Sequence, residues 1–129
     1  MSQRLRRFIL QDGVIGTQIF VFIGPYRALE QYAHHVKGEI PKDLAAHPGA
    51  VWTWTAEGHE VVCCFLRDVP RTPSTIGVLA HEGFHVVARV AEIVGIPVSS
   101  DTEEWCAYYL HWFIDQVLRR TQGRLRPCK

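Results

Sequence analysis

The stretch at residues 72–95, TPSTIGVLAHEGFHVVARVAEIVG, decides how the rest of the chain is interpreted. Thr72 is a suitable N-cap, and Pro73 follows at the first helical position. Gly95 stands where a helix would end in a left-handed residue. These signals predict one long helix that ends at about Val94.

Three polar side chains, His81, Glu82 and His85, lie in the apolar middle of this helix. Their burial costs free energy unless a metal ion or a hydrogen-bond network compensates for lost hydration. His81 and His85 lie one turn apart on the same face, a separation that suits two imidazoles binding one Zn²⁺. Glu82 lies about 100° around the helix, where it can reach a water molecule as a general base without being a ligand. The HExxH spacing therefore predicts a metal centre, with a hydrogen-bonded polar face as the alternative.

The remaining elements are predicted from turn residues and from the periodicity of apolar residues. They are strands at 7–11 and 17–23, a helix at 26–37, a hairpin of strands 51–56 and 60–68, and a last helix from 100 to about 120. Because the strands are segregated from the two closing helices, the order predicts an α+β domain with a short, mainly antiparallel sheet.

Length and composition indicate one globular domain, residues 1–129. The chain is 47% hydrophobic and 21% charged with a formal net charge of +1, which excludes a disordered or strongly basic protein. Basic residues concentrate at 1–6 and 121–129, which we expect to be frayed, solvated ends. The four cysteines include an adjacent pair and no CxxC, so reduced thiols are expected rather than a disulfide framework.

A catalytic zinc needs a third protein ligand and an open position for water. The last helix offers Glu103 and Glu104. Residues 100–103, SDTE, have the form of a capping box, which gives Glu103 a structural role and leaves Glu104 free to point inward. Glu104 is therefore the predicted third ligand, with Glu103 and Glu92 as alternatives.

The same face of the last helix would carry three further polar residues, Tyr108, His111 and Asp115, at helical spacing from Glu104. A hydrolytic site needs a donor for the developing oxyanion. His111 and Tyr108 are the candidates, together with Tyr109. The alternative is that these side chains only pack.

The HExxH helix, followed about twenty residues later by a helix with E-x-x-A, resembles the gluzincin branch of zinc metallopeptidases over residues 51–118. The size is similar to that of single-domain minigluzincins and of metallopeptidases encoded by bacteriophages. The resemblance implies a small zincin-like fold, His81, His85 and Glu104 as zinc ligands, and Glu82 as the base. It also implies that residues 60–67 form an edge strand that pairs with an extended peptide.

The chain departs from this pattern at Tyr108, where many gluzincins have Asp or Asn to orient the first histidine. Tyr108, Asp101 or a backbone carbonyl would have to orient His81 instead.

The expected function is that of a cytoplasmic zinc metallopeptidase (in the host cytoplasm if phage-encoded) acting on a peptide or protein. No signal peptide or membrane span is recognisable. The second hypothesis is a weakly active or inactive zinc-binding accessory protein that acts through protein contacts. The third is a metal-free binding module that uses its basic tail.

Overall fold

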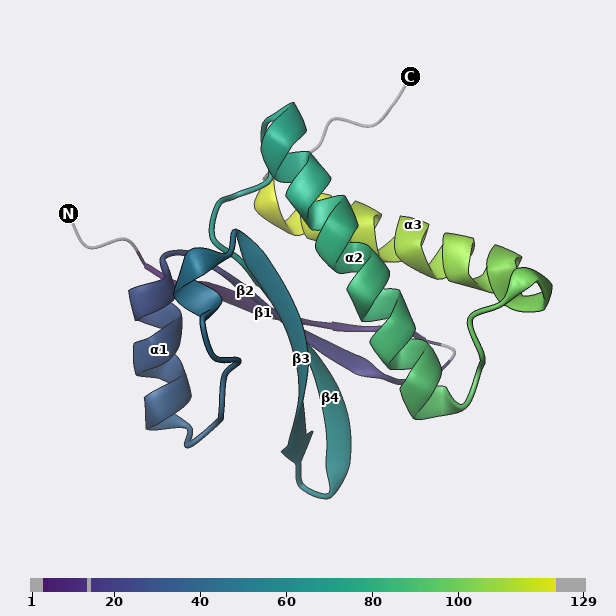
Figure 1. The fold of residues 1–129 in the computed structure, drawn as a ribbon, viewed down its shortest axis with the longest axis horizontal. Coiled ribbons are helices and arrows are strands. Elements are labelled where there is room, and N and C mark those ends of the chain that lie inside the picture. The colour runs from purple at the N-terminus through teal and green to yellow at the C-terminus, as the bar shows by residue number, and fades with distance from the viewer. Residues whose placement is uncertain (1–3, 14, 123–129) are drawn as a thin grey trace.

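The computed structural model describes residues 4–13 and 15–122 (Figure 1). Its elements are β1 (Arg6–Gln11), β2 (Gln18–Ile23), α1 (Tyr26–His35), β3 (Gly49–Ala56), β4 (His59–Leu66), α2 (Pro73–Val94) and α3 (Glu103–Thr121), with short 3₁₀ turns at Leu44–Ala46 and Ser100–Thr102. The predicted elements are therefore present, with ends shifted by a few residues. Most of the expected basic ends, 1–3 and 123–129, lie outside the described residues, as does Cys128. Arg6 already belongs to β1.

The four strands form one mixed sheet in the order β1-β2-β4-β3. β1 and β2 pair antiparallel, as do β3 and β4, whereas β2 and β4 pair in parallel, with Ile19 opposite Val62. The α+β class is thus confirmed. The prediction that 60–67 forms an edge strand is wrong, because β2 occupies the far side of β4 and leaves β3 at the edge. Residues 61–66 are buried without interruption, as is typical of an internal strand.

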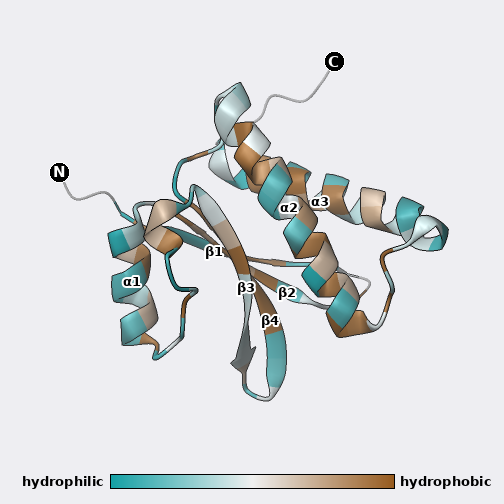
Figure 2. Ribbon diagram, viewed as in Figure 1, coloured by the Kyte–Doolittle hydropathy of each residue, from teal (hydrophilic) through white to brown (hydrophobic). Residues whose placement is uncertain are grey.

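Helices cover both faces of the sheet, with α1 on one face and α2 and α3 on the other (Figures 1 and 2). Two apolar cores result, one on each side of the sheet. The adjacent residues Cys63 and Cys64 contribute to different cores because neighbouring strand residues point to opposite faces. Together with Cys106 they are free thiols, as expected.

Helix α2 begins and ends as its sequence predicts. The amide of Thr75 donates to the Thr72 hydroxyl at 3.2 Å, the amide of Thr72 donates to the Thr75 hydroxyl at 2.9 Å, and Gly95 has φ 80°. The start of α3 differs from the prediction. The capping box is formed by Ser99 and Thr102, whose hydroxyl accepts from the Ser99 amide at 3.0 Å. The expected box of residues 100–103 is wrong by one position.

Gly83 sets how α3 packs on α2. A Cβ at Gly83 would lie 2.8 Å from Cδ1 of Leu110 and 3.3 Å from Cδ2 of Phe113, so the two helices approach closely there. Residue 83 lies about 200° around the helix from His81. Helix α3 therefore covers the face of α2 that is opposite the histidines, and leaves the histidine face open.

Candidate metal centre

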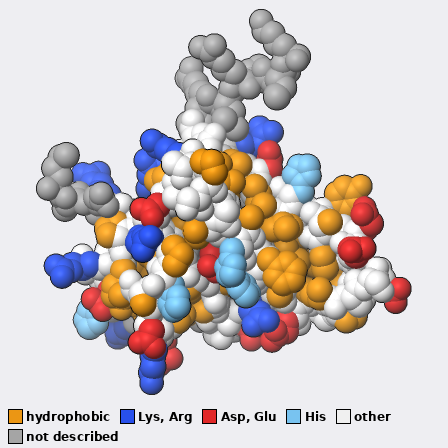
Figure 3. All heavy atoms as spheres, turned by 45° about the horizontal axis from the view of Figure 1, so that its top comes forward, with side chains coloured by type: hydrophobic (Ala, Val, Ile, Leu, Met, Phe, Trp, Pro, Cys, Tyr) orange, Lys and Arg blue, Asp and Glu red, His pale blue; other side chains and the backbone are white. Residues whose placement is uncertain are grey.

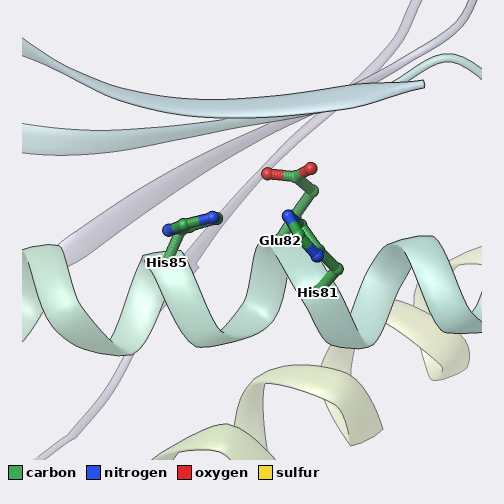
Figure 4. Close-up of side chains that lie close together, drawn as sticks. All are labelled: His81, Glu82 and His85. Carbon is green, nitrogen blue, oxygen red and sulfur yellow. The ribbon is translucent and has the colours of Figure 1, made fainter. Parts of the chain in front are cut away.

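His81, Glu82 and His85 come together on the open face of α2. Each offers one potential ligand atom, and these atoms lie within 4.8 Å of one another. The two imidazole centroids are 5.1 Å apart. All three side chains point from α2 toward the strands, while α3 runs along the other side of α2 (Figure 4). The three residues could hold a metal ion.

The surroundings of Glu82 support this possibility. The residue is only 6% exposed, and burial raises the pKa of its carboxyl group, an effect that positive charge on His81, His85 and His47 opposes. No hydrogen bond links the carboxylate to any residue within 4–13 and 15–122. Neither imidazole has a hydrogen-bond partner in that part of the chain either. A carboxylate that opens into the cavity without a protein donor, beside two imidazoles that make no hydrogen bond in the described chain, is a donor set that fits a bound cation.

The centre opens into a cavity of about 660 Å³ between α2 and the beginning of β3. Its walls are residues 47–51 on one side and, on the other, α2 side chains between Ser74 and Arg89. Histidine side chains are exposed at the middle of this face of the molecule, with acidic and hydrophobic side chains beside them (Figure 3). β3 has no partner on its outer side in the described sheet, so the cavity lies along a free strand edge.

Glu104, the predicted third ligand, is not part of this group. It is exposed in the first turn of α3, so the expectation that it points inward is wrong. Leu110 lies at the contact with Gly83, and six residues of helix place Glu104 about 9 Å farther along the α3 axis. The alternatives Glu103 and Glu92 are also exposed and outside the group.

The other predicted residues of α3 do not reach the centre. Tyr108 is 70% exposed, His111 is exposed, and neither lines the cavity. Asp115 on the same face pairs with Arg119 at 2.8 Å. This face is a solvated surface. Tyr109 is buried instead, and its hydroxyl donates to Asp12 at 3.0 Å.

No hydrogen bond within the described residues orients His81 through Tyr108, Asp101 or a backbone carbonyl.

The structure adds one histidine that the spacing of motifs did not single out. His47, in the loop before β3, lines the cavity with His81, Glu82 and His85. The only sequence signal for it is its place two residues before a strand that flanks the HExxH helix.

No family model, curated protein or solved structure matches the chain. None of the helices within residues 4–13 and 15–122 combines the length and apolar character that a bilayer crossing needs.

Proposed function

We propose that this protein is a zinc-dependent peptidase whose general base is Glu82. The observation that carries the proposal is the carboxylate of the buried residue Glu82, which has no donor in the described chain and lies beside the two imidazoles in the wall of an open cavity. Imidazole nitrogens are common zinc ligands. Bound zinc would lower the pKa of a coordinated water molecule to near 7.

In the proposed reaction, the oxygen of a water molecule adds to the carbon of the scissile carbonyl, and Glu82 accepts the proton that this water molecule loses. Glu82 then delivers that proton to the leaving amine as the C–N bond breaks.

The free edge of β3 supports a peptide as the substrate. An extended peptide could add to β3 as a further strand, since backbone N–H and C=O groups of an edge strand are available for pairing. This geometry would bring the peptide along the cavity wall formed by residues 49–51 and past the histidines. The free thiols in the described chain fit a protein that works in a reducing compartment such as the cytoplasm.

Glu82→Gln tests the proposal. The variant should bind zinc as the wild type does, because the imidazoles remain. It should cleave unfolded, fluorescently labelled casein about 10²- to 10⁴-fold more slowly, because the base is lost. Glu92→Gln, an exposed carboxylate on the same helix, is the matched control and should cleave normally. Equal cleavage by Glu82→Gln and the wild type would contradict the assignment.

A zinc-binding protein without turnover is the second candidate, and the exposed position of Glu104 favours it. Wild-type protein that binds one zinc ion but leaves the labelled casein intact would support this candidate over the peptidase.

A further inference from the structure

We propose that His47 is the third protein ligand of the metal centre, in place of a carboxylate from α3. The inference rests on the metal site of the proposed function and identifies one of its ligands. His47 has an extended conformation, φ −116° and ψ 146°, and precedes Pro48 and Gly49.

Residues 47 and 48 form a bend, and β3 begins directly after it at Gly49. A Cβ at Gly49 would lie 2.8 Å from Cγ of Glu82 and 3.2 Å from its Oε2, so that side of the backbone faces the centre. His47 therefore leads into the strand end that lies against Glu82, and it lines the cavity together with the residues of α2.

The backbone at His47 is held in position on both sides. The His47 amide donates to the Leu44 carbonyl at 3.1 Å, and Leu44 is only 1% exposed. The Arg67 amide donates to the Pro48 carbonyl at 2.9 Å, which fixes the loop to the chain leaving β4. The imidazole itself is exposed, and no residue in the described ranges accepts or donates a hydrogen bond to it. His47 is not a member of the group whose ligand atoms lie within 4.8 Å of one another, so its side chain has to turn toward His81 and His85 to bind the same ion. The backbone that carries the imidazole is thus fixed, while the imidazole itself is available to an ion.

Three imidazoles and one open position form a known ligand set for catalytic zinc. With His47 as the third ligand, Glu82 does not have to coordinate the metal and stays available as the base. No residue of α3 is then required, which agrees with the exposed position of Glu104.

The test compares the zinc affinity of purified full-length variants, measured by competition with a chromophoric chelator. His47→Ala should bind zinc at least about tenfold more weakly than the wild type, since loss of even an outer partner of a ligand weakens binding by about 10- to 100-fold. His59→Ala and His34→Ala remove exposed histidines elsewhere and should bind as the wild type does. His47→Asp should recover part of the affinity.

Cobalt(II) substitution gives a second measurement that does not depend on activity. The visible absorption of the cobalt-loaded wild type should change in His47→Ala and stay unchanged in His59→Ala. Circular dichroism of the metal-free variants should show equal folding, because His47 is exposed.

The outcomes separate this inference from the proposed function. Wild-type protein that binds no zinc would overturn both. Wild-type protein that binds zinc, with His47→Ala binding equally tightly, would overturn the role of His47 alone. A loss of affinity in Glu104→Ala but not in His47→Ala would return the third ligand to α3.

Discussion

The side chain of Glu82 lies directly against the backbone of Gly49, so the first residue of β3 forms the surface on which the proposed base rests. Added to Gly49, a Cβ would lie 2.8 Å from Cγ of Glu82 and 2.8 Å from the Phe65 carbonyl oxygen. Only a residue without a side chain fits between α2 and β4 at this point.

Gly49→Ala should therefore lower the free energy of unfolding by about 1–3 kcal/mol and slow casein cleavage, because the new methyl group displaces Glu82. Urea denaturation and the cleavage assay measure the two effects. Gly77→Ala is the control for stability alone, because Gly77 lines the cavity; its Cβ would meet no atom within 4 Å, and it should stabilise helix α2 by about 0.5–1 kcal/mol. A Gly49→Ala protein with unchanged stability and activity would show that Glu82 does not lie directly against Gly49.

Gly83 allows a similar prediction for the packing of α3. Gly83→Val should lower the free energy of unfolding by about 1–3 kcal/mol, because its side chain would collide with Leu110 and Phe113. Gly83→Ala should change it by less than about 1 kcal/mol, because the better helix propensity of alanine offsets the shift required of Leu110. Urea denaturation distinguishes the two variants, and equal stabilities would argue against a close approach of the helices.

The buried pair of Tyr109 and Asp12 predicts both a loss of stability and a pH dependence. Tyr109→Phe should lower the free energy of unfolding by about 1–3 kcal/mol at pH 7, because a buried carboxylate loses a donor. Tyr108→Phe, at a side chain that is 70% exposed, should change it by less than about 0.5 kcal/mol.

Burial and the nearby Asp12 raise the pKa of Tyr109 above its ordinary value, which is about 10. As the pH rises past 10, the unfolded chain loses this proton before the folded chain does, so the contribution to stability decreases. The difference between wild type and Tyr109→Phe in urea denaturation should therefore be smaller at pH 11 than at pH 7. A constant difference would contradict the raised pKa.

The buried thiols should be inert in the folded protein. Burial raises the pKa of the Cys63 thiol to about 12 and that of Cys64 higher still, so neither forms an appreciable amount of reactive thiolate at pH 8. In a Cys128→Ser background, Ellman's reagent should modify only Cys106 in the native protein and all three thiols in urea. If Cys63→Ser is added to the Cys128→Ser background, only Cys64 and Cys106 remain. Rapid reaction of both thiols in the native protein would then show that Cys64 is accessible and would contradict the prediction.

The parts of the fold that depend on neighbouring residues in the sequence could be predicted. Thr72, Pro73 and Gly95 fixed the ends of α2 because caps act within a few residues. Local signals could not predict which strand of the β3–β4 hairpin pairs with β2. The pairing of Ile19 with Val62 joins residues far apart in sequence, and either hairpin strand could have accepted β2. The unbroken apolar run at 61–66 was the available signal that β4 is internal.

In the site, too, the residues that local geometry determines were predictable, and those that tertiary packing determines were not. His81, Glu82 and His85 were predictable because one helical turn determines their geometry. The position of Glu104 depends instead on how α3 crosses α2, and Gly83 determines that crossing through a contact that helical periodicity does not encode. His47 could not be recognised without knowing that β3, rather than β4, lies beside the cavity.

The parallel pairing of β2 with β4 has a consequence for how the molecule forms. Between the two strands the chain must complete α1, the 3₁₀ turn at Leu44–Ala46 and β3. Closing so long a loop is entropically costly, so the sheet centre forms late compared with the local β3–β4 hairpin. β3, β4 and α2 follow one another in the chain, so the wall that carries His47 and the helix that carries His81 can meet before this slow step, and the candidate metal centre can form before the sheet is complete.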